Sequence, residues 1–280
     1  MIPQKQTKIK PKNESVDYAE KKFNHQINKR IERIFFWSLV LFLIVSFFAR
    51  NNFKSVKSPN SKLFNEPIRT ELADSSPIEF SQDGFKFTLT PLYEYEMSAL
   101  VVNRLDYTWF SLTRASNAFP MDLCMTWGEN IRSGAYRHSS VNFRQDFRFC
   151  FGNWSRESNF SWAEVSNNHL VIEDEAIRKK AMSIVEGDQI HLRGKLVNVK
   201  AENMDGNLGK YENQISNWNS SVKLGDSGAG ACEVIFVEEL EILKKGNPFF
   251  FHGFKFALYA LLSIIFWKVG VFFYEIWREK

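Results

Sequence analysis

The apolar run Ile34–Ala49 constrains this chain more than any other feature. It has no charged residue and is bounded by Arg33 and Arg50. As a helix rising about 1.5 Å per residue, its sixteen residues extend roughly 24 Å, slightly less than the ~30 Å hydrocarbon core of a bilayer. The flanking arginines can reach the head groups by snorkelling. A core helix of a soluble protein is the alternative, but such helices normally keep a polar stripe. The run therefore predicts a transmembrane helix over residues 34–50.

A second apolar run lies near the C-terminus, at Phe249–Phe273, with Lys255 near one end and Lys268 near the other. Both ammonium groups can reach head groups, so the run predicts a second transmembrane helix over residues 248–274 and a cytoplasmic tail over residues 275–280. One stripe of this helix suits packing against another helix, with interfacial snorkelling and incidental small residues as the alternative. The stripe consists of His252, Lys255, Tyr259, Ser263 and Gly270.

The N-terminal flank is basic. Residues 1–16 are lysine-rich with two prolines, a composition that predicts a disordered tail. Residues 17–33 carry apolar side chains at helical spacing among charges, which predicts an amphipathic helix on the cytoplasmic leaflet, with a partner-helix or coiled-coil role as the alternative. No small-residue cleavage site follows Phe48, so we interpret the first run as an uncleaved anchor.

The topology follows from the two spans and the basic flank. Both termini are expected in the cytoplasm and the central domain outside, in a setting such as the bacterial inner membrane with a periplasmic domain. The formal net charge of +4 comes from the ends of the chain, and residues 51–248 are net acidic. Nucleic-acid binding by this region is therefore not expected. Membrane lipids and other membrane-protein subunits, or a second copy of the chain, are the expected partners.

The region between the spans divides into a linker and a domain. Residues 51–77 contain three prolines among many Ser and Asn residues, which predicts a tether. Residues 78–247 show repeated alternation of apolar and polar side chains, which predicts a mainly β (α+β) domain of antiparallel strands with one helix at 173–185. The segments expected to form strands are 84–90, 93–103, 122–127, 141–151, 187–199 and 232–243.

The segment Gly187–Val199 combines a Gly-Asp start, alternating apolar residues and a glycine in mid-strand, Gly194. It resembles the strand–kink–strand segment of OB-fold-like barrels, including the extramembrane domains of bacterial NfeD-type membrane proteins. A mid-strand glycine suits a barrel strand, which must bend sharply at its corner. The resemblance implies an OB-like barrel in which residues 103–137 and 200–219 are insertions.

The chain has three cysteines, none in a CxxC pair, so neither a metal site nor a cofactor is predicted. Outside the cytoplasm Cys124 and Cys150 could pair, because each lies on the polar face of its expected strand. We predict this disulfide, with Cys232 as the free cysteine. The sequence alone leaves open which of the three cysteines stays free.

The segment Gly225–Gly230, GDSGAG, resembles the nucleophile loop of chymotrypsin-like serine proteases. The resemblance implies Ser227 as a nucleophile, with Asp226 beside it. Nothing around the histidines of the domain (His138, His169 and His191) matches the alanine–histidine–cysteine segment of that family. A glycine-rich turn leading into the strand at Cys232 is the alternative.

Three tryptophans offer a further alternative function. Trp154, Trp162 and Trp218 could form a stacking platform for sugars, or they could belong to the core. No catalytic constellation is complete, so we expect a non-enzymatic, membrane-anchored protein whose domain binds a partner or builds a membrane assembly. A membrane-tethered serine hydrolase and an oligosaccharide-binding module are the alternatives.

Overall fold

A computed structural model of the chain describes residues 12–82, 84–107, 119–146, 148–204, 215–228 and 230–279. The chain forms two compact units, one comprising residues 1–48 with 249–280 and the other residues 49–248. The predicted combination of two apolar terminal helices and a β-rich domain with one disulfide is confirmed.

The helical unit consists of α1 (Lys12–Ala49) and α4 (Pro248–Arg278). Two segments, Glu20–Ala49 and Pro248–Arg278, are long and apolar enough to cross a membrane. The structure has one continuous helix where the sequence predicts an amphipathic helix and a span, and this helix begins at Lys12 rather than residue 17.

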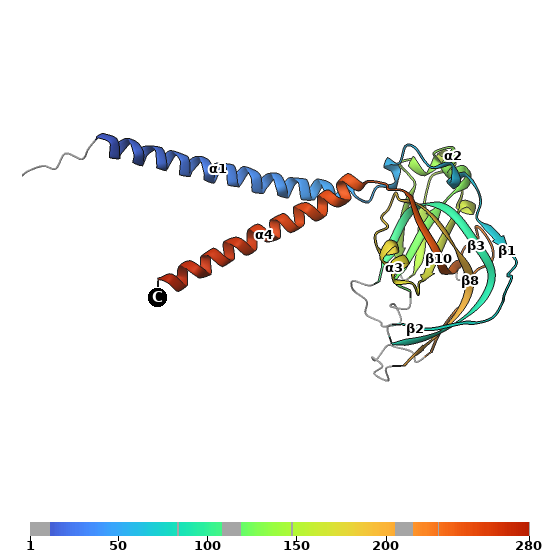
Figure 1. The fold of residues 1–280 in the computed structure, drawn as a ribbon. Coiled ribbons are helices and arrows are strands. Elements are labelled where there is room, and N and C mark those ends of the chain that lie inside the picture. Colours follow the sequence, from blue (N-terminus) through green and yellow to red (C-terminus); the bar gives the residue numbers. More distant parts are fainter. Residues whose placement is uncertain are drawn as a thin grey trace, which may run out of the picture. The chain divides into compact units, whose positions relative to one another are not determined.

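The helices α1 and α4 pack through small and aliphatic side chains. Leu39 lies against Ala257 and Leu261, and Gly253 lies so close to Phe42 that a Cβ there would meet the aromatic ring. The two ribbons diverge beyond this contact in the view of Figure 1, although the Lys268 ammonium still lies 3.9 Å from the Glu32 carboxylate. The predicted stripe His252–Gly270 lies on a different face of α4 and is exposed in this chain, so it stays a prediction about lipid or another subunit.

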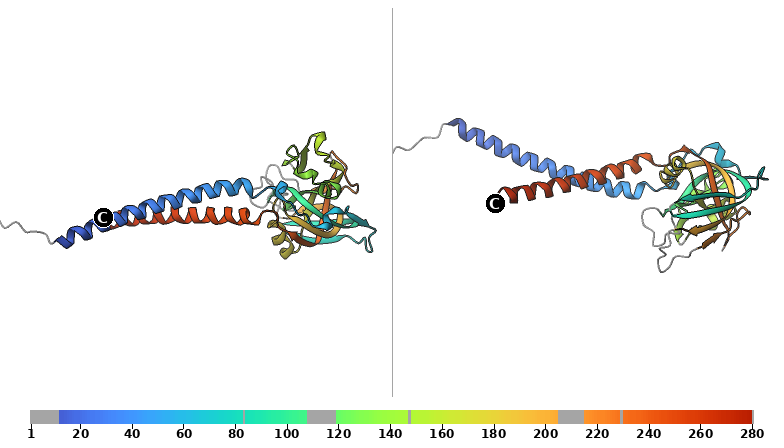
Figure 2. Two further views of the ribbon diagram at one scale, coloured as in Figure 1. Left: turned by 90° about the horizontal axis from the view of Figure 1, so that it is seen from above. Right: turned by 60° about the horizontal axis from the view of Figure 1, so that its bottom comes forward.

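The domain contains an eight-stranded sheet, with strand order β1-β3-β4-β7-β10-β8-β9 and β2 paired with β3. The strands follow a strongly curved course (Figures 1 and 2). Their bounds are β1 Ile68–Thr70, β2 Ile78–Gln82, β3 Phe85–Asp106, β4 Met121–Thr126, β7 Val165–Val171, β8 Gln189–Asn203, β9 Ile215–Trp218 and β10 Cys232–Lys244.

Five of these strands form a closed series of pairings. β3 pairs with β4, β4 with β7, β7 with β10, β10 with β8, and β8 again with β3. The β7–β10 pair is parallel, which corrects the expectation of a purely antiparallel sheet. Alternation along a strand records which face is buried but not which strand lies alongside or in which direction.

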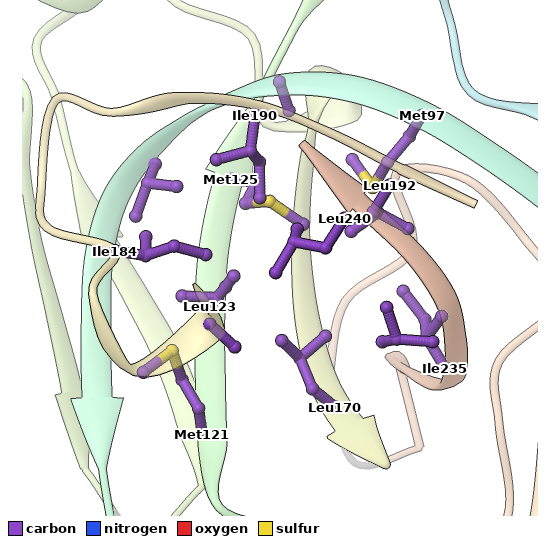
Figure 3. Packing of buried hydrophobic residues seen from close by; sticks show 14 of the residues in the cluster. Met97, Met121, Leu123, Met125, Leu170, Ile184, Ile190, Leu192, Ile235 and Leu240 are labelled. Atoms are coloured by element: carbon purple, nitrogen blue, oxygen red, sulfur yellow. The ribbon is translucent and has the colours of Figure 1, made fainter. Parts of the chain in front are cut away.

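The main hydrophobic core lies between these five strands and the helix α3 (Glu175–Met182). The labelled side chains of Figure 3 converge there, among them Met97 from β3, Leu170 from β7 and Leu192 from β8. Asp174 caps α3 because its carboxylate accepts a hydrogen bond from the Ile177 backbone N–H at 2.8 Å. The helix expected at 173–185 is therefore present but shorter.

Gly194 of β8 occupies the position at which the sequence predicts a bend. A Cβ at this residue would overlap the backbone carbonyl of Phe236 in β10. The register of the two strands also shifts between Val237 and Glu239, directly opposite. The glycine permits this close approach of two backbones.

Residues 51–77, predicted as a tether, are instead part of the compact domain. Phe53, Val56 and Leu63 are buried in a second hydrophobic cluster, and the Tyr136 hydroxyl donates a hydrogen bond of 2.6 Å to the Val56 carbonyl. These apolar residues have no periodic spacing, so the sequence pattern did not mark them. Short helices in the domain are η1 Phe53–Ser55, η2 Ser61–Phe64, α2 Gly128–Arg132, η4 Ala135–Arg137, η5 Arg156–Ser158 and η6 Trp162–Glu164.

The segment 141–151, predicted as one strand, is a hairpin of β5 (Asn142–Asp146) and β6 (Phe149–Asn153). Arg148 turns the chain with a φ of 71°, a conformation that alternation of side chains does not reveal. The Cys124–Cys150 disulfide connects β6 to β4, with a Cα–Cα distance of 5.9 Å.

Candidate functional site: a pocket beside a buried Asp–His–Arg network

A pocket of about 360 Å³ lies between the β5–β6 hairpin, the start of β7 and the loop that precedes β10. Its wall is mostly apolar, with three aromatic rings, but it also contains a free thiol and one sulfur of the disulfide. The lining residues from the hairpin side are Phe149, Cys150, Phe151 and Trp162, and those from β7, the loop and β10 include Ser166, Asn167, Asp226, Ser227 and Cys232.

Several contacts attach the hairpin side of the pocket to the sheet. The disulfide ties Cys150 to Cys124 of β4. The Gln145 amide donates a hydrogen bond of 3.1 Å to the Asn167 side-chain oxygen of β7. The Trp162 ring lies against Gly152, where any Cβ would clash with it. These contacts hold the hairpin in place as one wall of the pocket.

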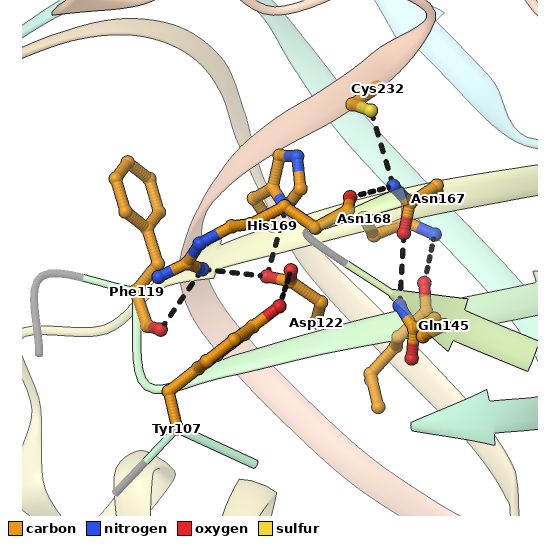
Figure 4. A network of polar contacts seen from close by, with 10 residues as sticks. Tyr107, Phe119, Asp122, Gln145, Asn167, Asn168, His169 and Cys232 are labelled. Atoms are coloured by element: carbon orange, nitrogen blue, oxygen red, sulfur yellow. Dashed lines mark hydrogen bonds and ion pairs between the residues drawn. The ribbon is translucent and has the colours of Figure 1, made fainter. Parts of the chain in front are cut away.

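A polar network borders the pocket and centres on Asp122 of β4, which is fully buried (Figure 4). One of its carboxylate oxygens, Oδ1, lies 2.8 Å from Nδ1 of His169 and 3.1 Å from the Arg148 guanidinium. The other oxygen, Oδ2, accepts a hydrogen bond of 2.8 Å from the Tyr107 hydroxyl. Arg148 also lies over the Tyr107 ring, 3.8 Å from its centre. The buried carboxylate thus has two cationic partners and a hydroxyl donor.

The strand register explains how Asp122 and His169 meet. They are directly paired across β4 and β7, so their side chains leave the same face of the sheet. Burial lowers the pKa of His169, but the negative charge of Asp122 and hydrogen bonds to Asp122 and Cys232 outweigh it and raise this pKa to about 9. The imidazole is therefore a cation at neutral pH.

Cys232 is the free cysteine of the chain and is half-buried at the start of β10. Its sulfur accepts a hydrogen bond of 3.2 Å from the Asn167 side-chain amide, which Figure 4 shows beside His169. In the register of the sheet Asn167 lies opposite Cys232 on one side and Cys124 on the other. Thiol, amide and imidazole therefore share one face.

The structure places Ser227 at the exposed rim of the same pocket. Among the described residues, no histidine forms a hydrogen bond with it. The neighbouring Asp226 carboxylate accepts a hydrogen bond of 2.6 Å from Ser221 instead. Glycines 225, 228 and 230 all have positive φ, and β10 begins directly afterwards at Cys232. This geometry is that of a glycine-rich turn leading into a strand.

The three tryptophans singled out in the sequence divide between two places. Trp154 and Trp162 stack, with ring centres 5.8 Å apart and an interplanar angle of 8°, and Trp162 lines the pocket. Trp218 lies apart from them, 5.5 Å from the His169 ring and 4.8 Å from the Phe119 ring. Two of the three therefore belong to the pocket side of the domain.

The sequence reasoning missed the strand β7 and with it His169. The middle of this strand is polar, Ser166 to His169, yet all its residues are buried. Apolar alternation is absent because these polar side chains are buried through hydrogen bonds of the Asn168 amide to Leu123 and Ser166 and the ion pair of His169 with Asp122. A run of hydrogen-bonding residues between Val165 and Leu170 is a weak signal for a buried strand.

The fold and the pocket define a chain with a disulfide-bonded, β-rich domain between two apolar helices. In the described ranges, no three histidine, cysteine, aspartate or glutamate side chains gather so as to hold a metal ion. Comparison with family models, with curated proteins and with solved structures found no match.

Proposed function

We propose that the chain is a non-enzymatic, two-span membrane protein whose domain, residues 49–248, is an OB-like barrel that binds a protein partner outside the cytoplasm. The closed series of pairings β3-β4-β7-β10-β8 supports the barrel. The parallel β7–β10 pair and the position of α3 between β7 and β8 suit the same architecture. In OB-folds the second and third strands carry the binding face, which here corresponds to β4 and β7.

One observation carries the binding proposal. Beside the pocket, three large aromatic side chains remain exposed: Phe149 at 42%, Phe151 at 41% and Trp154 at 40%. Aromatic residues grouped next to a concave surface are typical of protein interfaces. The partner is a second copy of the chain or another membrane-protein subunit, because two apolar helices would keep the domain near other membrane proteins.

Photo-crosslinking in native membranes tests this binding. A benzoylphenylalanine at position 151 should give one discrete crosslinked species, and Phe151→Ser should weaken the complex on native gels. The same probe at Glu129, an exposed residue of α2, is the control and should give none. Equal crosslinking at both positions, or none at either, would contradict the proposed surface.

Labelling of engineered cysteines tests the orientation. A Ser58→Cys thiol, on the exposed surface of the domain, should react with a membrane-impermeant maleimide in intact cells. A Ser15→Cys thiol should react only after permeabilisation. The opposite pattern would reverse the topology.

The stacked pair Trp154 and Trp162 favours one second candidate, an oligosaccharide-binding module. A glycan array with the full chain and its Trp154→Ala variant decides this. Sugar binding that the variant loses would support the second candidate over a protein partner.

A further inference from the structure

A groove of about 850 Å³ lies within the helical unit, between residues 29–37 of α1 and residues 263–268 of α4. Phe36 and Ile264 line its inner part, and both also pack against the apolar contact between the two helices. The groove is therefore a continuation of that contact, and both of its walls belong to one compact unit.

The outer part of the groove has an excess of positive charge. Three cations line it, Lys29, Arg33 and Lys268, together with one anion, Glu32. The Lys268 ammonium lies 3.9 Å from the Glu32 carboxylate, and both side chains are exposed. Among the described residues, no carboxylate forms an ion pair with Lys29 or Arg33. Two of the three positive charges therefore have no counter-charge in the groove.

The groove changes from charged to apolar along its length. On α1 its lining runs from Lys29 and Arg33 to Phe36, and on α4 it runs from Lys268 to Ile264. The change coincides with the start of the apolar run, because Arg33 directly precedes Ile34. In a bilayer the cations would therefore lie at the depth of the head groups and the apolar part at the depth of the acyl chains.

Two exposed tryptophans, Trp37 and Trp267, line the groove where the charged part meets the apolar part. An indole ring has an apolar body and an N–H donor, and tryptophans in membrane proteins are enriched at the level of the head groups. The two rings thus offer apolar area to an acyl chain and donors to a head group.

We propose that this groove binds a phospholipid with a net negative head group. Its phosphate lies among Lys29, Arg33 and Lys268, which donate charge-assisted hydrogen bonds to it. Its acyl chain covers Phe36 and Ile264. The inference rests on the two-span part of the proposed function, and it adds a lipid ligand that partner binding by the domain does not require.

Other occupants satisfy only part of the groove. A free phosphate would pair with the cations but leave the apolar part uncovered. A zwitterionic lipid would cover the apolar part but bring a further cation to a site that already has an excess of them. A second copy of the chain that packed the same face here would place its own Lys29 and Arg33 against these cations. An anionic lipid complements both parts.

Native mass spectrometry of the full chain in dodecyl maltoside measures the preference. Equal amounts of dioleoyl phosphatidylglycerol and dioleoyl phosphatidylcholine are added, so that the two lipids differ only in the head group. Phosphatidylglycerol should be the first lipid bound by about fivefold or more. The double variant Arg33→Gln, Lys268→Gln should lose most of this preference and still bind either lipid.

The matched control is the double variant Lys22→Gln, Arg30→Gln. It removes the same charge from exposed positions of α1 that do not line the groove, and it should keep the preference. Arg33→Lys retains the charge and should also keep most of it. An excess of sn-glycerol 3-phosphate, a phosphate ester without acyl chains, should not displace the lipid. Unchanged circular dichroism of each variant reports intact helices.

Four results would overturn the inference. They are equal binding of the two lipids by the parent chain, an equal loss of preference in the groove variant and its control, displacement of the lipid by glycerol phosphate, and a lipid-free dimer in place of the lipid-bound monomer. Labelling of Ser58→Cys and Ser15→Cys is read separately. The expected labelling without a lipid preference removes only the groove site, whereas labelling that contradicts two spans removes the proposed topology.

Discussion

Nδ1 of His169 lies 2.8 Å from Oδ1 of Asp122, and both side chains are almost completely buried. This contact joins two neighbouring strands of the sheet, and Arg148 connects the same carboxylate to the hairpin turn. A buried ion pair of this kind contributes little net stability relative to an apolar replacement, but removing one partner leaves a buried charge uncompensated. The first two predictions concern this asymmetry.

Asp122→Asn should destabilise the domain by about 3–5 kcal/mol, because His169 and Arg148 would lose their common anion while the side-chain shape is kept. Thermal or denaturant unfolding of the full chain in detergent measures the change. Glu129→Gln is the matched control, since its partner Arg132 is at a similar 3.0 Å but both side chains are more than half exposed. The control should cost less than about 1 kcal/mol.

The stability of the domain should fall as pH rises from about 6.5 to 9. The pKa of His169 is raised to about 9 in the folded protein, so its contribution is complete below the unfolded value of about 6.5 and is lost as pH rises through 9. The shift corresponds to about 3 kcal/mol. Unfolding at a series of pH values should show this slope in the parent and a much flatter curve in His169→Gln.

A second titratable group, Glu186, adds to this slope at lower pH. Burial raises the pKa of Glu186 to about 7, against an opposing effect of the Arg104 charge. A raised carboxyl pKa also makes stability fall as pH rises, here between about 4.5 and 7. Glu186→Gln should flatten only this part of the curve. A stability that rises with pH across both windows would contradict both assignments.

Removing the disulfide should loosen the hairpin and destabilise the domain by about 2–4 kcal/mol, since it closes a loop of 26 residues. The double variant Cys124→Ala, Cys150→Ala isolates this effect. Unfolding measures the free energy, and hydrogen exchange at β5 and β6 should increase more than at β8 and β10. If both cysteines of the parent chain are found as free thiols in freshly isolated membranes, the prediction is wrong.

Gly194→Ala should be among the most damaging single-methyl additions, because its Cβ would overlap the Phe236 carbonyl. Overpacking of this kind typically costs about 1–3 kcal/mol or more. Arg193→Ala, at the exposed neighbouring residue, is the control and should cost less than about 1 kcal/mol. Equal stability of the two variants in unfolding experiments would show that β8 and β10 can separate at this point.

In α4, the predicted second span, Gly270→Leu should weaken assembly, and Lys255→Leu should insert normally but alter the complex. Among the described residues, no atom outside the adjacent turns of α4 lies within 4 Å of a Cβ placed at Gly270, so we expect a steric effect to come from another molecule. Native gels of both variants measure assembly, with Ala257→Leu as a contrast because it would disturb the contact with α1. If the variants at 255 and 270 migrate like the parent, the stripe His252–Gly270 faces lipid and not another subunit.

The sequence alone determined the features that depend on neighbouring residues. The two apolar runs became the long helices α1 and α4, and alternation of apolar and polar side chains predicted the strands β3, β4, β8 and β10, although all six residues of β4 are buried. Gly194 was noticed in the sequence as a mid-strand glycine, although the reason for it lies in the fold, where a Cβ would overlap the Phe236 carbonyl of β10. The pairing of Cys124 with Cys150 was predicted from strand faces and is confirmed.

The tertiary structure decided what depends on partners distant in the chain. Strand order and the parallel β7–β10 pair are set by contacts across the sheet, which period-two patterning does not encode. The burial of Phe53 and Leu63 in the segment predicted as a tether has the same origin. Above all, Asp122, His169 and Cys232 come from three different strands. Their chemistry arises only when the register of the sheet brings an anion, a cation and a thiol onto one face.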